Sequence, residues 1–353
     1  MKLIHCADLH LDSALNSYLD EDEANLRNQE ILDSFKRLVD YALNNEVEIV
    51  LIAGDLFDHN HPKKNTLNQF LELIKEHSTI KFIYLKGNHD LEVTFNNVPI
   101  NLYLFDDMWH TYCFDDIAIS GRVMNNQNYD LIYDDLPIIN GYINIITLHG
   151  ELAINSGKDL INLNKLRNKA IDYLALGHFH SYIKRQLDDM TIIYPGCLEG
   201  RGFDECGAKG FVLLDISKQK IESEFIPFAK RTLHLVECDI KDCLTSIEVL
   251  KLMQNKAANY KKDDMLEFIL KGVIEADLYL PLNYLKDTLE NDHYFVKIKD
   301  NTKLKIDYAK YRHNISLKGE FLRQVEDKES NNKLKEAIIH TGFAVLNDED
   351  FEE

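Results

Sequence analysis

Short apolar runs alternate along the chain with longer stretches in which apolar residues recur every three or four positions. The runs are rich in Val, Ile and Tyr and have the length of strands, whereas the longer stretches have the period of amphipathic helices. Strands are expected at residues 3–7, 47–53, 81–85, 117–120, 142–148, 171–176 and 191–194. Helices are expected at 24–43 and 65–75. This alternation predicts a layered α/β fold.

A different rhythm begins near residue 230. Two apolar runs, 210–216 and 220–227, predict a hairpin that closes the first region. The pattern after it predicts a small α+β domain, with strands at 232–238, 265–272 and within 293–306, and helices at 244–259 and 282–290. A tail follows with helical patterns at 319–325 and 332–339, and its acidic end is most simply a solvated, frayed terminus. We therefore expect three parts, residues 1–230, 231–312 and 313–353, and the tail is a candidate partner element.

The composition restricts the class of protein. The 353 residues suffice for about two domains, and 45% of them are apolar, which excludes wholesale disorder. No apolar stretch approaches the roughly 20 residues of a membrane span, and residues 1–8 lack a signal-peptide pattern, so a soluble, cytoplasmic protein is expected. The six cysteines are scattered without a CxxC pair, which argues against a disulfide framework and against a thiolate zinc site.

Polar residues able to bind a metal directly follow five of the predicted strands. The five groups are Asp8-Leu9-His10, Gly54-Asp55-Leu56-Phe57-Asp58, Gly87-Asn88-His89-Asp90, Leu148-His149-Gly150 and Gly177-His178-Phe179-His180. In open α/β sheets the loops at the carboxyl ends of the strands meet at one crevice. A single group of this kind would be weak evidence, but five in order, several of them beside glycine, predict one shared site.

The types of side chain limit the metal. Carboxylates, imidazoles and one carboxamide, without thiolate, fit Mn²⁺, Fe²⁺ or Zn²⁺ in five- or six-coordination. Seven or eight such ligands are too many for one ion. Two ions about 3.5–4 Å apart, sharing a bridging carboxylate, would use them all.

These motifs resemble those of the calcineurin-like metallophosphoesterase superfamily, and within it those of SbcD-type nucleases of double-strand-break repair. The resemblance covers residues 1–230 and includes the segment from Tyr194-Pro195-Gly196 to Lys209-Gly210-Phe211. It implies two mixed β-sheets packed face to face and flanked by helices, followed by a small α+β capping domain. Leu11-Asp12-Ser13 stands where many such nucleases have Leu-Gly, which places the chain closer to a Gram-positive subgroup.

The resemblance also assigns ligands. It implies that the first metal is held by Asp8, His10 and His180, and the second by Asn88, His149 and His178. Asp55 would bridge the two ions. The implied metal is most often Mn²⁺, with Fe²⁺, Zn²⁺ or Mg²⁺ as alternatives.

Three further residues receive roles beside the metals. His89 matches the catalytic histidine of the family, which assists the leaving oxygen, and Asp90 is expected to orient it. Asp58 is expected to support a metal ligand or to cap a helix rather than to act directly in catalysis.

The function implied by the resemblance is a metal-dependent DNA exonuclease or endonuclease subunit that works with an SbcC-type coiled-coil ATPase. Relatives also form homodimers. Two other classes stay open: a metallophosphatase or phosphodiesterase acting on nucleotides or other small phosphoesters, and a scaffold without activity. Digestion of DNA separates the first from the second, and any phosphoesterase activity excludes the third.

The net charge of −19 bears on how DNA could be bound. Residues 1–200 contain 16 basic and 30 acidic side chains, whereas residues 201–353 contain 24 and 29. Lys230-Arg231 and Lys261-Lys262 could contact phosphates or could be ordinary solvated surface. Because affinity for DNA grows with the number of cationic contacts, we expect the isolated chain to bind DNA weakly.

Overall fold

The computed structural model describes residues 1–15, 19–217, 220–275, 278–305, 311, 313 and 315–346. The chain divides into two compact units, Met1–Thr232 and Leu233–Glu353. The acidic end expected to be a frayed terminus, residues 347–353, lies outside the described residues. All six cysteines are free thiols, as their spacing indicated.

The first sheet of unit 1 contains six strands in the order β14-β13-β1-β2-β3-β4. These strands are β1 (Lys2–Cys6), β2 (Ile49–Ala53), β3 (Lys81–Leu85), β4 (Leu102–Leu104), β13 (Gly210–Ser217) and β14 (Lys220–Pro227). Strands β1 to β4 are parallel to their neighbours, whereas β13 pairs antiparallel with both β1 and β14. The predicted hairpin therefore closes this sheet.

The second sheet also contains six strands, in the order β11-β12-β10-β7-β6-β5. They are β5 (His110–Phe114), β6 (Ile117–Gly121), β7 (Ile143–His149), β10 (Tyr173–Gly177), β11 (Ile183–Leu187) and β12 (Met190–Tyr194). The central four are parallel and the two edge strands antiparallel. Alternate residues of both sheets, such as Leu51 and Ile145, share one buried core. The expected pair of mixed sheets packed face to face is confirmed.

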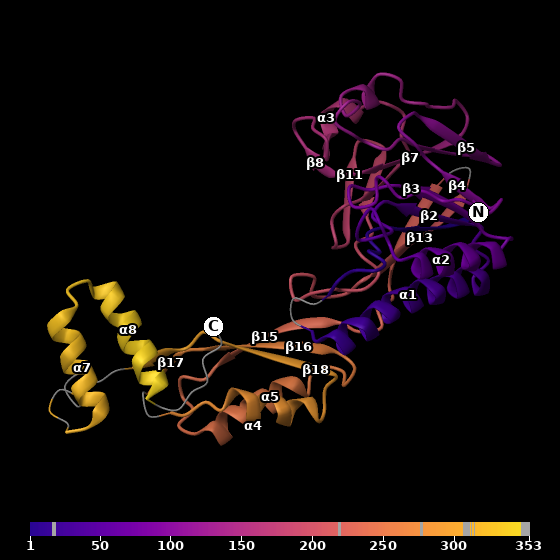
Figure 1. The fold of residues 1–353 in the computed structure, drawn as a ribbon. Coiled ribbons are helices and arrows are strands. Elements are labelled where there is room, and N and C mark those ends of the chain that lie inside the picture. Colours follow the sequence, from indigo (N-terminus) through magenta and orange to yellow (C-terminus); the bar gives the residue numbers. More distant parts are fainter. Residues whose placement is uncertain are drawn as a thin grey trace. The chain divides into compact units, whose positions relative to one another are not determined.

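Helices and loops cover the outer faces of the two sheets. Figure 1 shows α1 (Glu21–Asn44) and α2 (Lys64–Glu76) lying side by side next to the first sheet. Phe35 of α1 stacks on Phe70 of α2 with ring centroids 5.6 Å apart. The second sheet is covered by irregular segments that include β8 (Glu151–Ala153), β9 (Leu160–Asn162), α3 (Leu163–Leu166) and the short helix η1 (Leu131–Tyr133). Both sheets are thus buried on both faces.

The carboxyl ends of the parallel strands from the two sheets meet. The side chain of His149, the last residue of β7, donates from Nδ1 to the carbonyl of Ala53 at the end of β2, over 2.9 Å. A Cβ atom on Gly54 would lie 2.0 Å from the same nitrogen. Glycine is therefore required at this position for the two sheets to approach.

Unit 2 is built on a parallel sheet of β15 (Leu233–Asp239), β16 (Met265–Lys271) and β18 (Phe295–Asp300). Helices α4 (Ser246–Ala257) and α5 (Leu282–Glu290) pack on it through a common apolar cluster. The short strands β17 (Val273–Glu275) and β19 (Lys303–Lys305) pair in parallel. Helices α7 (Leu317–Lys328) and α8 (Asn332–Val345) contact each other around Leu322, Ile339 and Phe343.

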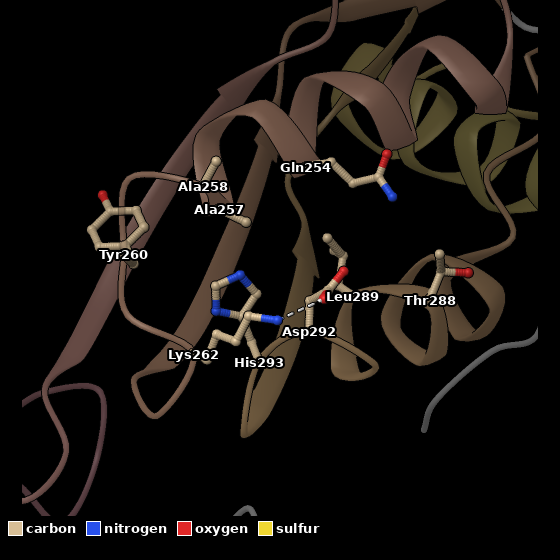
Figure 2. Close-up of a pocket in the computed structure, with 9 residues that line it drawn as sticks. All are labelled: Gln254, Ala257, Ala258, Tyr260, Lys262, Thr288, Leu289, Asp292 and His293. Atoms are coloured by element: carbon tan, nitrogen blue, oxygen red, sulfur yellow. Dashed lines mark hydrogen bonds and ion pairs between the residues drawn. The ribbon is translucent and has the colours of Figure 1, made fainter.

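A shallow pocket lies between the carboxyl ends of α4 and α5 (Figure 2). Tyr260 and His293 line it, and Lys262 forms an ion pair with Asp292 over 3.2 Å. Among the described residues of the whole chain, none of the helices has the length and apolar character needed to cross a membrane.

Candidate metal centre

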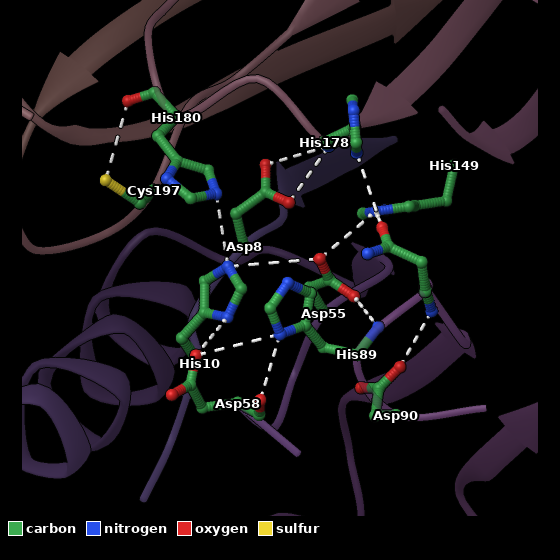
Figure 3. Close-up of polar contacts among 12 residues, drawn as sticks. Asp8, His10, Asp55, Asp58, His89, Asp90, His149, His178, His180 and Cys197 are labelled. Atoms are coloured by element: carbon green, nitrogen blue, oxygen red, sulfur yellow. Dashed lines mark hydrogen bonds and ion pairs between the residues drawn. The ribbon is translucent and has the colours of Figure 1, made fainter. Parts of the chain in front are cut away.

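The seven residues expected to bind metal come together where the strands of the two sheets end (Figure 3). Asp8, His10, Asp55 and Asn88 follow β1, β2 and β3 of the first sheet, while His149, His178 and His180 lie at the ends of β7 and β10 of the second. The side chains are largely withdrawn from solvent, and Asp8 and His10 have no exposed surface. Both sheets therefore contribute to one buried polar cluster.

The first cluster contains Asp8, His10 and His180, whose nearest ligand atoms all lie within 4.8 Å of one another. The Nε2 atoms of His10 and His180 are 3.1 Å apart. On the other side of each ring, His10 Nδ1 lies 2.9 Å from an Asp58 oxygen, and His180 Nδ1 donates to Glu205 over 2.6 Å. The two carboxylates favour a proton on each Nδ1, which leaves the Nε2 lone pairs facing each other.

Two facing lone pairs repel unless a proton or a metal ion lies between them. Burial lowers the pKa of His10 to about 4, so its ring is neutral and able to act as a ligand. Imidazole nitrogens bind zinc at about 2.0–2.1 Å, so two of them at neighbouring positions of one ion lie about 3 Å apart. The observed separation of 3.1 Å fits this arrangement.

The second cluster forms around the side-chain oxygen of Asn88. His149 Nε2 lies 3.1 Å from it and His178 Nδ1 lies 3.3 Å from it. Because His149 Nδ1 donates to a backbone carbonyl, its Nε2 carries the free lone pair. Burial lowers the pKa of His149, but nearby Asp55 and Asp8 outweigh this effect and raise it to about 9. Without a metal, a proton would occupy the position on Nε2.

Asp55 lies between the two clusters. Its Oδ2 atom is 3.2 Å from His149 Nε2 and 3.9 Å from His10 Nε2, and its Oδ1 accepts the backbone N–H of His89 over 2.9 Å. Burial raises the pKa of this carboxyl, but the adjacent histidines lower it further, and the net pKa is below its ordinary value. One oxygen directed toward both clusters fits a carboxylate shared by two ions.

Asp8 shows why a cation suits this place. Burial, and then the negative charge of Asp55, raise the pKa of Asp8 to about 6, although neighbouring histidines oppose the shift. Two carboxylates in a buried site are costly unless positive charge accompanies them. The donor set of carboxylate oxygens, imidazole nitrogens and one amide oxygen fits divalent ions of borderline hardness.

The backbone around these residues is strained. Asp8, His10, Asp55 and His178 have positive φ angles of 53°, 47°, 48° and 116°. Non-glycine residues in such conformations cost about 1–3 kcal/mol each and cluster at functional sites. A Cβ atom on Gly87 would lie 2.1 Å from Asp55 Oδ1, so glycine is needed here for close approach. The fold thus holds these side chains in place at a local energetic cost.

His89 lies at the edge of the cluster and is exposed to solvent. Its Nδ1 is 2.9 Å from the backbone carbonyl of Asp58, and its ring meets that of His10 edge to face at 4.8 Å. Donation from Nδ1 leaves Nε2 available to another molecule. Asp58 is therefore the neighbour that orients both His10 and His89.

Asp90 does not contact the His89 ring in the way we expected. Its buried carboxylate accepts hydrogen bonds from the backbone N–H groups of Phe57 and Gly87 and from the Tyr84 hydroxyl, at 3.1, 2.7 and 2.6 Å. A fully occupied carboxylate holds the turn that carries Asn88 and His89. Its orienting effect is thus on the backbone and not on the imidazole.

Three supporting residues were not assigned from the sequence. Glu205 and Arg201 contact His180 or its neighbours, and Lys209 donates from Nζ to the His180 carbonyl over 2.5 Å. All three lie in the segment from Tyr194 to Phe211 that carries part of the resemblance, which was the available signal. Nothing in their spacing indicates which side chain turns toward the cluster.

The chain belongs to the calcineurin-like phosphoesterase family, whose family model matches residues 1–191. It is thus a phosphoesterase of the hydrolase class. Among curated proteins it is 27% identical to SbcD of the SbcCD nuclease from Staphylococcus saprophyticus, over 82% of this chain and 83% of that protein. It is 29% identical to an uncharacterized metallophosphoesterase, YhaO, of Bacillus subtilis, over 64% of this chain and 60% of that protein.

Solved structures of low sequence identity are also similar. One is an archaeal phosphodiesterase, with 15% identity, a TM-score of 0.33, and coverage of 64% of this chain and all of that one. Another is a dimetal phosphatase from Danio rerio, with 10% identity, a TM-score of 0.42, and coverage of 61% and 92%.

Proposed function

We propose that this chain is the nuclease component of a DNA-processing complex and hydrolyses phosphodiester bonds with two divalent metal ions. The observation that carries the proposal is the extent of the likeness to the staphylococcal nuclease protein. That likeness covers 82% of the chain, more than the 191 residues that the family model matches, so it continues beyond the part shared with phosphoesterases in general.

The proposed ligands divide as the two clusters do. Asp8, His10 and His180 would hold one ion, Asn88, His149 and His178 the other, and Asp55 would bridge them. Bound ions of this kind neutralise a phosphodiester and lower the pKa of water toward about 7. The protein contributes ligands fixed by strained loops, so little reorganisation is needed when substrate arrives.

His89 is the proposed proton donor to the leaving oxygen. It is the exposed histidine beside the clusters, and its Nδ1 is fixed by the Asp58 carbonyl. The opposite nitrogen, Nε2, can then give a proton to a departing oxygen. Asp90 assists indirectly, through the turn that precedes His89.

Unit 2 is the proposed capping domain, followed by a docking element. Its exposed lysines, such as Lys262, are candidates for contact with phosphates. The helical pair α7 and α8 is the proposed docking element for an SbcC-type ATPase, and homodimerisation is a further expectation from the resemblance. The deficit of basic residues in unit 1 suggests that affinity for DNA comes in part from such a partner.

The nuclease proposal predicts that linear duplex DNA is degraded in the presence of Mn²⁺ and not after chelation. Loss of activity on chelation should be at least about 10³-fold, because each 1.36 kcal/mol of transition-state stabilisation is tenfold in rate and the ions supply several. The assay uses end-labelled duplex, single-stranded and hairpin DNA, with readdition of Mn²⁺ as the control. Fast turnover of mononucleotides together with inert DNA would exclude the nuclease and favour a small-molecule phosphoesterase.

Asp8→Ala is expected to lose about one metal ion per chain. This residue belongs to the first cluster, and removing its carboxylate leaves two imidazoles there, whereas the second cluster keeps its donors. Metal content after equilibration with Mn²⁺ and removal of free ion measures the loss. Asp188→Ala, at an exposed turn, serves as the control. Unchanged metal content in Asp8→Ala would refute the ligand assignment.

A further inference from the structure

The guanidinium of Arg201 joins two carboxylates beside the first cluster. Its Nη1 lies 2.7 Å from Asp58 Oδ1, and its Nη2 lies 2.9 Å from Glu205 Oε1. The backbone N–H of Arg201 also donates to the other Glu205 oxygen over 2.8 Å. The arginine side chain is only 17% exposed, so these are sheltered, charge-assisted contacts.

Each of the two carboxylates contacts one imidazole of the first cluster. Asp58 lies 2.9 Å from His10 Nδ1, and Glu205 accepts from His180 Nδ1 over 2.6 Å. With the 3.1 Å separation of the two Nε2 atoms, the contacts form a closed ring in which Arg201 is the link opposite the proposed metal. A rigid, planar guanidinium fixes the separation of the two carboxylates and hence of the two imidazoles.

The second cluster is supported in another way. His149 is held by the Ala53 carbonyl, and His178 lies against Asn88. Backbone and amide groups fix these rings, whereas charged side chains fix those of the first cluster. A change at Arg201 should therefore act on the first cluster.

We propose that Arg201 is a positioning residue which, through Asp58 and Glu205, holds His10 and His180 as a matched pair of metal ligands and so sets the affinity of the first cluster for a divalent ion. The proposal rests on the metal-dependent function proposed above. It assigns a role to a residue that contacts neither metal nor substrate.

Charge and position make opposite predictions for this residue. A guanidinium is positive and repels a dication, so its charge alone would weaken metal binding, and its removal would tighten it. If the main role is to fix the two carboxylates, removal weakens binding. Loss of a partner that orients a ligand typically costs 10–100-fold in metal affinity.

The test is a titration of the full-length, metal-free chain with Mn²⁺, followed by electron paramagnetic resonance of the free ion. The wild type is expected to bind two ions. Arg201→Gln is expected to raise the dissociation constant of one ion by about 10–100-fold and to leave the other within about twofold. Arg201→Lys, which keeps the charge but not the fork, should behave similarly, and Arg167→Gln, at an exposed ion pair, should match the wild type.

Nuclease activity provides a second readout. In Arg201→Gln the concentration of Mn²⁺ for half-maximal activity should rise in parallel with the dissociation constant, while kcat recovers at saturating Mn²⁺. Thermal unfolding of the metal-free variants shows whether they fold. Glu205→Gln provides an independent variant of the same ring and should weaken the same ion.

Tighter or unchanged binding in folded Arg201→Gln would overturn the proposal, as would equal weakening of both ions. If Arg201→Gln does not fold, Arg201→Lys and Glu205→Gln decide by the same criteria. Failure of the wild type to bind two ions would count against the proposed metal-dependent function itself, and so is distinct from failure of the role of Arg201.

Discussion

Asp55→Asn is expected to abolish phosphodiesterase activity, with a fall in kcat/KM of about 10³-fold or more. The Asp55 oxygen that faces His149 and His10 is the proposed bridge between two ions, and a neutral amide bridges dications poorly. The substitution has nearly the same shape, and an amide oxygen can still accept the N–H of His89. Folding should therefore survive while the chemistry is lost.

The measurement is cleavage of end-labelled DNA and of a chromogenic phosphodiester at saturating Mn²⁺. Asp188→Asn is a matched control, because Asp188 also has a positive φ angle, 53° against 48° for Asp55, but lies at an exposed turn. It should retain wild-type activity. Residual activity of Asp55→Asn within tenfold of the wild type would refute the bridging role.

His89→Ala is expected to lower kcat by about 10²–10⁴-fold while the chain still binds two ions. The imidazole is proposed to give a proton to the leaving oxygen, and it is not among the proposed ligands. Its ring is held by the Asp58 carbonyl at the surface of the cluster, so removal should disturb the ligands little.

Single-turnover cleavage of DNA and metal content, measured on the same preparation, separate the two effects. His110→Ala is the matched control, because His110 is similarly exposed and pairs with Asp106. A substrate whose leaving group needs no protonation, such as an activated aryl ester, should be affected less. Loss of both ions in His89→Ala would make this residue a ligand and not a proton donor.

The positions of the proposed ligands could be predicted because they depend on strand ends. A buried parallel strand such as 49–53 or 81–85 is a continuous apolar run that stops where the chain turns polar, and the structure places these strands as predicted. Once the strands are known, residues that follow them must lie at one edge. The proposed sites of Asp55 and Asn88 follow from that logic.

The edge strands were missed for the converse reason. Strands β4, β5 and β11 are short or solvent-exposed, and the burial of β11 alternates weakly along Ile183–Leu187, so they lack the apolar run that marks the central strands. The partners of the ligands were missed too. Glu205 reaches His180 from a loop 25 positions further along the chain, and only tertiary structure determines that contact.

Asp90 shows a different limit of sequence reasoning. Its neighbour along the chain, His89, was the expected partner, but adjacent residues in a tight turn point in different directions. The carboxylate instead satisfies buried backbone donors of the two loops that carry Phe57 and Gly87. Proximity in sequence was a poor guide where the backbone itself needed an acceptor.

Each cluster draws on both sheets, and this affects when the centre can be completed as the polypeptide is synthesised. Asp8, His10 and Asp55 leave the ribosome early, but neither cluster has its full set of donors until β10 and the residues through His180 have followed. A nascent chain that ends before this point presents carboxylates and imidazoles without their partners. Stable loading of two ions is therefore an event that follows the packing of the two sheets, and it occurs on a chain that has already folded.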